Sequence, residues 1–392
     1  MYILVINSGS SSVKFSIFAT AAHAEPVTVL DGEVSGIGSP YGSFEIRHND
    51  DSLSAKVPAA VADSQQSIDL VLDAISKPGI PSIHAIGYRV VHPGPKLDRH
   101  QRITDAVLSD LDAAATFAPL HDPDALRLIR MVMAHFPRLP HFVCFDTVFH
   151  KTMPETATTY AIPMRYRDAG VRRYGFHGLS CESVVRQLQA AELQYERMVI
   201  AHLGSGCSVT ALVDGESVDT TMGLTPTGGV VMGTRPGDLD PGLILYLLRE
   251  QGATVDSVEQ MLNHDAGIKA LFCVNDMRKL REAAVGGDER AKLAATVFAS
   301  SVRRAIGGMA ALHGLEALIF TGGIGEHDAV SREAIASGLF NSQPRIDPLL
   351  NATHGDGIRK ITSDSSTIPV YVVPAREDVM IAVHVAQMAA SN

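Results

Sequence analysis

Three glycine-rich stretches of this chain have the composition of turns that bind phosphate groups. The first, NSGSSSVKF from Asn7 to Phe15, places an amide, four hydroxyls and a lysine between two apolar segments. The others are HLGSG at 202–206 and FTGGIGEHD at 320–328. Backbone N–H groups of a tight glycine turn converge on an anion without a side chain in the way. Glycine and serine are also ordinary turn residues, but three such stretches in one chain favour a nucleotide or polyphosphate ligand.

The phosphate loop predicted here is not of the Walker A type. That motif ends in Gly-Lys-Ser/Thr and opens a helix, whereas Val13, Phe15 and Ile17 alternate as they would in a strand. The stretch at 320–328 instead follows an apolar strand and precedes a helix-like segment. Strand-to-helix turns also need glycine for purely structural reasons.

Cationic side chains form a second group of candidates. Arg89 lies in GYRVVHPG at the polar end of an apolar strand, and Arg235 lies in MGTRPGDLDP before a helix. Arginine forks bind carboxylate and phosphate oxygens in a bidentate manner, although many arginines at strand ends form surface ion pairs. His177 in YGFHG and His121 in PLHD are either ligands or packed core residues. Asp146 in FDTVFH ends a strand, where it binds a metal or caps the next segment.

The elements that must position these residues alternate between apolar strands and helices, as in an α/β protein. Strands are predicted at 2–6, 13–18, 83–91, 141–145, 198–203, 209–213, 317–320 and 368–373. Helices are predicted after Thr104, over 125–136, after Ser180, from Pro241, over 288–313 and from Arg376. Asp240 is placed to cap the helix that begins at Pro241.

The chain also contains an internal repeat of one sequence pattern. INSGSSSVKFSI near the N-terminus and AHLGSGCSVTAL from Ala201 both read as strand, glycine-serine turn, strand. The second copy precedes Asp214-Gly215, a hairpin turn signal that adds a further antiparallel strand. Two such units, about 195 residues apart, predict two similar α/β halves. Ligands often bind between such halves, so we expect the site in a cleft between them.

Composition bounds the class of protein. With 392 residues, 46% hydrophobic content and a net charge of -10, the chain fits a globular protein of two or three domains and disfavours a nucleic-acid partner. Its four cysteines are scattered and form no zinc or disulfide pattern. No apolar run approaches the ~18 residues that span a bilayer, and no signal peptide is evident. We therefore expect a cytoplasmic protein that does not associate with a membrane.

Ten stretches occur in the order and approximate spacing of the acetate kinase family, and together they cover residues 3 to about 382. They are ILVINSGSSSVKF, GYRVVHPG, PLHDP, CFDTVFHKTMP, RRYGFHGLS, HLGSG, MGLTP, VVMGTRPGDLDPG, FTGGIGE and VPAREDVMIA. The resemblance implies a duplicated ribonuclease H-like fold of the actin and hexokinase type. It implies a first domain at 1–148, completed by a C-terminal helix at 380–392, and a nucleotide-binding second domain at 149–379.

The resemblance further implies a homodimeric enzyme that transfers the γ-phosphoryl group of ATP, with Mg2+, to acetate. It assigns catalysis to Arg89, Asp146, His177 and Arg235, with Arg89 also binding the substrate carboxylate. It assigns the acyl pocket to Val91, Leu120, Phe176 and Pro226, and the metal to Asn7 and Glu377. It assigns the nucleotide to Lys14, His202, Leu203, Gly204, Ser205, Gly206, Asp276, Met277, Arg278, Gly323, Ile324, Gly325, Glu326 and His327.

Electrostatics supports these implied roles. A carboxylate substrate is ionised at neutral pH, so no general base is needed to activate it. The obstacle is repulsion between two anions, and cations that position and neutralise the phosphoryl group remove that obstacle. The sequence departs from the family pattern at Pro93, Asp122, Ser205, Pro236 and His327. Three alternatives stay open: a propionate or other short-acyl kinase, a pyrophosphate-dependent enzyme, and an actin-like nucleotide sensor that transfers nothing.

Overall fold

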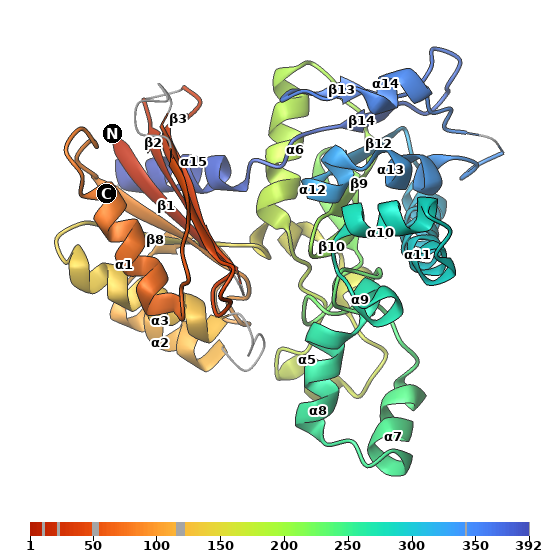
Figure 1. Ribbon diagram of the computed structural model, residues 1–392, viewed down its shortest axis with the longest axis horizontal. Coiled ribbons are helices and arrows are strands. Elements are labelled where there is room, and N and C mark those ends of the chain that lie inside the picture. The colour runs from red at the N-terminus through yellow and green to blue at the C-terminus, as the bar shows by residue number, and fades with distance from the viewer. Residues whose placement is uncertain (10–11, 22–23, 49–54, 115–121, 342, 392) are drawn as a thin grey trace. The chain divides into compact units, whose positions relative to one another are not determined.

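The computed structural model describes residues 1–9, 12–21, 24–48, 55–114, 122–341 and 343–391. The chain divides into two compact units, which we call unit 1 (residues 1–148 and 376–392) and unit 2 (residues 149–375) (Figure 1). Both are mixed α/β structures, each built around one sheet. Among the described residues, no helix combines the length and hydropathy that crossing a membrane requires.

Unit 1 contains an eight-stranded sheet in the order β5-β4-β3-β2-β1-β6-β8-β7. β1 is antiparallel to β2 but parallel to β6, and β6 is parallel to β8. The carboxyl ends of β1, β6 and β8 therefore meet at one edge of the sheet. The strands are β1 (Tyr2–Ser8), β2 (Ser12–Ala19), β3 (Val27–Ser35), β4 (Ser43–His48), β5 (Ala55–Pro58), β6 (Ala85–Val90), β7 (Gln101–Arg102) and β8 (His141–Phe145).

Helices cover both faces of this sheet. Alternation along β6 sends Ile86, Tyr88 and Val90 into a core shared with α1 (Ser64–Ile75), α2 (Asp105–Ala114) and α3 (Asp122–His135). The opposite face receives α15 (Glu377–Ala390), which packs on β1 and β6. Gly87 allows this close approach, because a Cβ there would lie 2.6 Å from a methyl group of Val385. The end of the chain thus completes unit 1.

Unit 2 repeats the same topology. Its six-stranded sheet has the order β11-β10-β9-β12-β14-β13, in which β9 is antiparallel to β10 and parallel to β12. The first five strands follow the pattern of β3-β2-β1-β6-β8 in unit 1, which confirms the predicted duplication. The strands are β9 (Arg197–Leu203), β10 (Cys207–Val213), β11 (Glu216–Thr220), β12 (Ala317–Thr321), β13 (Arg359–Lys360) and β14 (Val370–Val372).

Helices and short loops surround the unit 2 sheet. The longest is α11 (Glu289–His313), and α6 (Gly178–Ala190) precedes β9. The others are η2 (Val148–Thr152), α4 (Glu155–Thr158), α5 (Met164–Asp168), α7 (Pro241–Glu250), α8 (Val255–Gln260), η3 (Met261–Asp265), α9 (Gly267–Phe272), α10 (Met277–Val285), α12 (Gly322–His327), α13 (Ala329–Ala336) and α14 (Pro348–Ala352). All four cysteines are free thiols.

Most predicted elements are present with bounds that differ by a few residues. The Asp214-Gly215 hairpin is confirmed, with φ of 51° and 81°, and Asp240 caps α7 by accepting from the N–H of Gly242. The predicted strand at 368–373 begins only at Val370, because Pro369 has no N–H for a ladder. The glycine-rich stretch at 320–328 leads from β12 to the helix α13, as predicted, but it also forms the short helix α12.

Candidate active site

The carboxyl edge of the unit 1 sheet gathers four of the predicted site residues. Asn7 lies near the end of β1, Arg89 near the end of β6, and Asp146 directly after β8, while Glu377 begins α15. Three neighbouring parallel strands thus deliver an amide, a guanidinium and a carboxylate to one place. The backbone of Arg89 is fixed within β6, because its neighbours Tyr88 and Val90 are buried in the core.

Arg89 is held by a bidentate ion pair. Its Nε donates to Oδ1 of Asp146 at 2.8 Å and its Nη2 to Oδ2 at 2.5 Å, while Nη1 donates to Oδ1 of Asn7 at 3.2 Å. Burial alone would lower the pKa of Arg89, but the carboxylates of Asp146 and Glu377 raise it above its usual range. The guanidinium therefore stays charged, and Asp146 is its orienting partner, a pairing that the sequence did not indicate.

A further acid, Asp378, joins this cluster; it lies in the stretch VPAREDVMIA, but no role is predicted for it from the sequence. Nδ2 of Asn7 donates to Oδ1 of Asp378 at 3.0 Å and lies 3.5 Å from Oε2 of Glu377. Desolvation raises the pKa of Asp378, the hydrogen bond from Asn7 lowers it, and the neighbouring Glu377 charge raises it again. The cluster brings several side-chain oxygens together, the ligand type that Mg2+ and Ca2+ prefer. We name Asn7, Arg89, Asp146, Glu377 and Asp378 the acceptor cluster.

Some of the other predicted site residues in unit 1 lie outside the described residues. Lys14 lies on β2, is exposed, and pairs with Asn7 across the hairpin register. Val91 directly follows β6 and is half-buried. Leu120 and His121 lie outside the described residues, as do two serines of the first glycine-serine turn, Ser10 and Ser11.

In unit 2, the HLGSG loop joins β9 to β10 and meets two predicted cations. A Cβ added to Gly206 would lie 3.2 Å from Nε2 of His177 and 3.6 Å from Nη1 of Arg235. Glycine therefore leaves open the space beside a histidine and an arginine. The adjacent Cys207 donates its thiol to the carbonyl of Gly204, and burial raises its pKa to about 12, so it stays a neutral thiol.

The loop that carries Arg235 is fixed by backbone contacts. The N–H of Met232 donates to the carbonyl of Arg235 at 3.0 Å, and Nη1 of Arg235 donates to the carbonyl of Pro226 at 3.1 Å. Gly267, at the start of α9, packs against this loop with φ of 64°, and a Cβ there would lie 2.2 Å from the carbonyl of Met232. Pro226 and Phe176, both predicted for the acyl pocket, are buried in unit 2.

A cavity of about 990 Å3 opens beside the glycine loops of unit 2. Of the predicted nucleotide residues, it is lined by Gly204, Ser205, Asp276, Met277, Arg278, Gly323, Ile324 and His327. Asn275, Arg281 and His354 complete part of its wall without having been predicted. This volume lies at the upper end of the range of about 300–1,000 Å3 that is typical of small-molecule sites.

Several residues predicted to bind the nucleotide do not line the larger cavity but support its wall. Oε1 of Glu326 accepts from the N–H groups of Gly322 and Ala375, both at 3.0 Å. Arg332, fully buried, donates to the carbonyls of Gly325 and Glu326, both at 2.9 Å. Burial lowers the pKa of Arg332 to about 10, so it remains charged at neutral pH. These contacts hold α12 in place. Leu203, another residue predicted to bind the nucleotide, is instead buried in the core.

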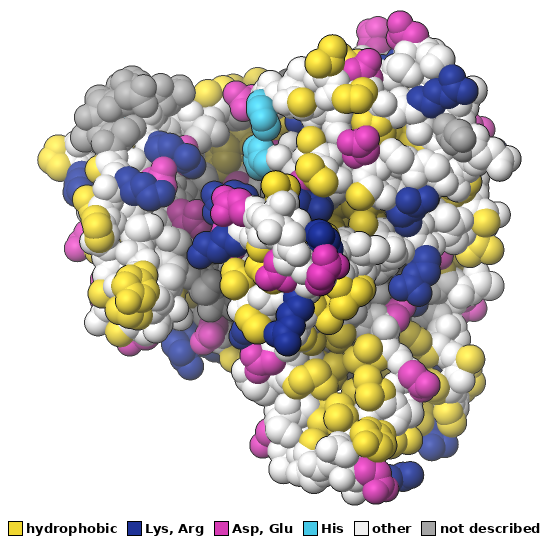
Figure 2. All heavy atoms as spheres, turned by 45° about the vertical axis from the view of Figure 1, so that its right-hand side comes forward, with side chains coloured by type: hydrophobic (Ala, Val, Ile, Leu, Met, Phe, Trp, Pro, Cys, Tyr) yellow, Lys and Arg dark blue, Asp and Glu magenta, His cyan; other side chains and the backbone are white. Residues whose placement is uncertain are grey.

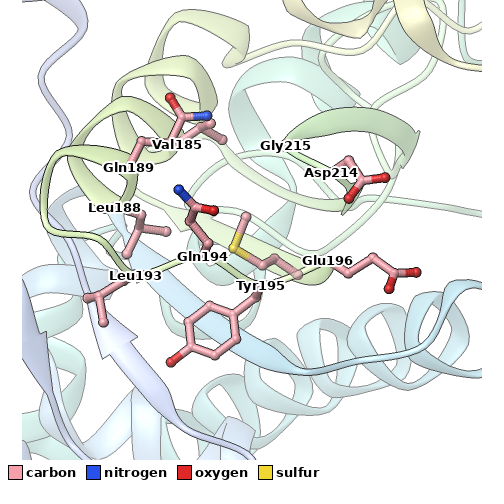
Figure 3. Close-up of a pocket in the computed structure, with 10 residues that line it drawn as sticks. Val185, Leu188, Gln189, Leu193, Gln194, Tyr195, Glu196, Asp214 and Gly215 are labelled. Carbon is pink, nitrogen blue, oxygen red and sulfur yellow. The ribbon is translucent and has the colours of Figure 1, made fainter.

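A second cavity of unit 2, of about 430 Å3, has a different character. Its residues come from the C-terminal half of α6, the turn that follows, the start of β9 and the β10–β11 turn (Figure 3). It is lined by Val185, Leu188, Gln189, Leu193, Gln194, Tyr195, Glu196, Met198, Asp214 and Gly215. None of these is a predicted site residue, whereas eight predicted residues line the larger cavity, which is therefore the candidate nucleotide site.

Comparisons with known proteins agree with this geometry. The family model described as the acetokinase family matches residues 2–383. An acetate kinase of Nitrobacter hamburgensis is 41% identical over 396 residues, which cover 97% of this chain and 95% of that protein. A crystal structure of a propionate kinase from Francisella tularensis has a TM-score of 0.90 at 34% identity, and one of Porphyromonas gingivalis acetate kinase 0.86 at 30%, each covering 99% of both chains.

The position of the Arg235 loop can be tested at Gly267. Gly267→Ala should strain a left-handed backbone by about 1–3 kcal/mol and also push the loop away, because its Cβ would overlap the carbonyl of Met232. Since Gly233 and Ile268 line the larger cavity, we expect weaker ATP binding in calorimetry as well as a lower Tm.

Gly252→Ala is the matched control, because Gly252 also has φ of 63° but open space around the added Cβ. It should lower Tm through backbone strain alone and leave ATP affinity unchanged. Equal losses of ATP affinity in both variants would mean that the Gly267 contact does not position the loop.

Proposed function

The chain belongs to the acetokinase family, and on this premise we propose that it transfers the γ-phosphoryl group of MgATP to acetate, yielding ADP and acetyl phosphate. The observation that carries the choice of donor is the cavity of about 990 Å3 beside Gly204, Ser205 and Gly323. Pyrophosphate needs the glycine loops but no large adjoining cavity. A nucleoside needs both, so ATP suits the space better than pyrophosphate does.

The acceptor cluster supports a carboxylate as the second substrate. Arg89 carries a guanidinium, the group that pairs best with a carboxylate. Its Nε and Nη2 already donate to Asp146 at 2.8 Å and 2.5 Å, so acetate would accept from the N–H groups of Nη1 and Nη2 that Asp146 leaves. Asp146 acts in this proposal as the residue that positions Arg89, not as a base, because acetate already carries its negative charge.

The step is a displacement at phosphorus. One carboxylate oxygen of acetate forms a bond to the γ-phosphorus while the bond from that phosphorus to the bridging oxygen of ADP breaks. Negative charge moves onto the ADP oxygen. Arg235 and His177 stabilise the phosphoryl group during its transfer, and Lys14 binds the polyphosphate.

The oxygen donors of the acceptor cluster suit the magnesium ion that accompanies ATP. We assign that ion to Asn7 and Glu377, with Asp378 as a further oxygen donor beside them. When bound, magnesium would neutralise charge on the phosphates. The requirement for ATP also places the protein in the cytoplasm in this proposal.

Propionate is a second candidate acceptor, because the Francisella tularensis propionate kinase has the same architecture at a TM-score of 0.90. Val91, Phe176 and Pro226 are the apolar residues that we assign to the acyl chain. One methylene in such a pocket changes the free energy of the transition state by about 1–3 kcal/mol, so activity toward both acids is expected, with a preference set by this pocket.

Hydroxylamine trapping of acyl phosphate tests the proposal. The protein with Mg2+ should give a trappable product from ATP and acetate, less from ATP and butyrate, and none from pyrophosphate and acetate. Arg235→Ala should lower kcat about a hundredfold or more while ATP still binds. Product from pyrophosphate alone would overturn the choice of donor. ATP binding with no product from any short carboxylate would make the protein a nucleotide sensor.

A homodimer is the oligomeric state that we propose. The helix α7 has the sequence PGLILYLLRE, yet none of its residues is buried in the single chain. Leu243 and Tyr246 are three residues apart on α7, a spacing that places them on one side of the helix, and they are 40% and 51% exposed. Leu239, which lies just before the helix, is 38% exposed. Hydrophobic side chains gather on the lower part of the face in Figure 2, where the ribbon view has α7 and α8. We call these three residues the α7 face.

Sedimentation velocity tests this assignment. Leu243→Glu combined with Tyr246→Glu would bury charges in the proposed interface and should convert a dimer into a monomer at micromolar concentration. Leu293→Glu is the control, because Leu293 is equally apolar and 55% exposed but lies on α11, and it should leave the dimer intact. A wild-type monomer, or a dimer that survives the double change, would rule out the α7 face.

A further inference from the structure

Two histidines of unit 2 stack on each other beside the HLGSG loop. The rings of His177 and His202 have centroids 4.1 Å apart and planes inclined by 21°. Both side chains are nearly buried, with exposures of 9% and 7%. They come from different elements, since His177 precedes α6 with a left-handed backbone at φ of 60°, and His202 lies on β9.

Each ring has its Nδ1 on a buried serine. Nδ1 of His177 lies 3.0 Å from Oγ of Ser208 on β10, and Nδ1 of His202 lies 2.8 Å from Oγ of Ser180 on α6. The serines are 1% and 0% exposed. The Nε2 atoms face glycines, because Nε2 of His177 would lie 3.2 Å from a Cβ on Gly206, and Nε2 of His202 3.1 Å from one on Gly322.

The Nδ1 partner limits which ring nitrogen can carry the proton. A backbone carbonyl only accepts, so it would hold a proton on Nδ1 and leave a lone pair on Nε2. That lone pair would repel a phosphoryl oxygen. A serine hydroxyl can donate to Nδ1, which leaves the proton of a neutral ring on Nε2.

His150 of the same unit shows this arrangement completed. Its Nε2 lies 2.9 Å from the carbonyl of Phe176, which can only accept, and its Nδ1 lies 2.9 Å from Oγ of Ser217. Burial lowers the pKa of His150 to about 4, although the carbonyl of Phe176 raises it, so the ring is neutral. Its one proton must lie on Nε2, and Ser217 must donate to Nδ1.

We propose that Ser208 is a positioning residue for phosphoryl transfer: its hydroxyl donates to Nδ1 of His177 and keeps a proton on Nε2, where a phosphoryl oxygen takes the place that a carbonyl has at His150. Ser180 sets His202 in the same way. This inference rests on the proposed function for its catalytic consequence, but the position of the proton is a property of the resting protein.

Stacking makes these serines matter more. Two imidazolium ions whose centres lie 4.1 Å apart would repel each other, so the pair takes up a second proton less readily than the first. A neutral ring donates from Nε2 only while its Nδ1 accepts. Ser208 secures that form for the ring that faces Gly206 and Arg235.

Three variants separate positioning from simple support of the fold. Ser208→Ala removes the donor and should lower kcat about tenfold, within the range of about 10- to 100-fold seen for partners that orient metal-bound histidines, with KM for ATP and acetate changed less than threefold. Ser208→Thr keeps a hydroxyl and should recover most of kcat. Thr210→Val removes another buried hydroxyl from β10, bonded to Thr220 at 2.9 Å, and should leave kcat unchanged.

Nitrogen-15 spectra of histidine-labelled protein provide the direct reading, with the His177 signals assigned from a His177→Gln variant. In the wild type, the His177 proton should lie on Nε2, and in Ser208→Ala it should distribute over both nitrogens. A proton on Nδ1 in the wild type, or an unchanged distribution together with unchanged kcat in Ser208→Ala, would overturn the inference. A wild type that traps no acyl phosphate would instead overturn the proposed function, because the spectra require no turnover.

Discussion

Repulsion between an anionic nucleophile and an anionic phosphate is the constraint on which the rest of this structure depends. Two unit charges about 4 Å apart interact by roughly 4 kcal/mol at an effective dielectric constant of 20, and the γ-phosphate carries more than one charge. In the proposed function, two cations offset this repulsion. Arg89 lies near the end of the buried strand β6 in unit 1, and Arg235 lies in a loop of unit 2 that packs against α9.

Placing cations is not enough, because a cation near a carboxylate cluster must also be oriented. Asp146 grips Arg89 through both oxygens, and Asn7 links Arg89 to Asp378. Similar support recurs in unit 2, where Arg332 and Glu326 hold α12 against the larger cavity. In both units the residues beside a ligand are thus fixed by others behind them, as pre-organisation requires.

The sequence was sufficient to predict the fold class, the duplication and the places of most candidate residues, because strands, glycine turns and caps leave local signals. It did not indicate contacts made across the sheet. No role could be assigned from the sequence to Asp378, Ser180 or Ser208, because only folding brings them to Asn7, His202 and His177. Glu326 lies in a glycine-rich motif, but its direction depends on the backbone of Ala375, which lies 49 residues away.

The central claim is that acetate attacks the γ-phosphorus directly. Cations stabilise the transferring phosphoryl group, and no side chain is phosphorylated as an intermediate. The stereochemical course tests it most directly. With ATP made chiral at the γ-phosphorus by oxygen isotopes, one in-line displacement predicts acetyl phosphate of inverted configuration. Retention of configuration would contradict the account, because it requires two displacements and therefore a covalent intermediate on the protein.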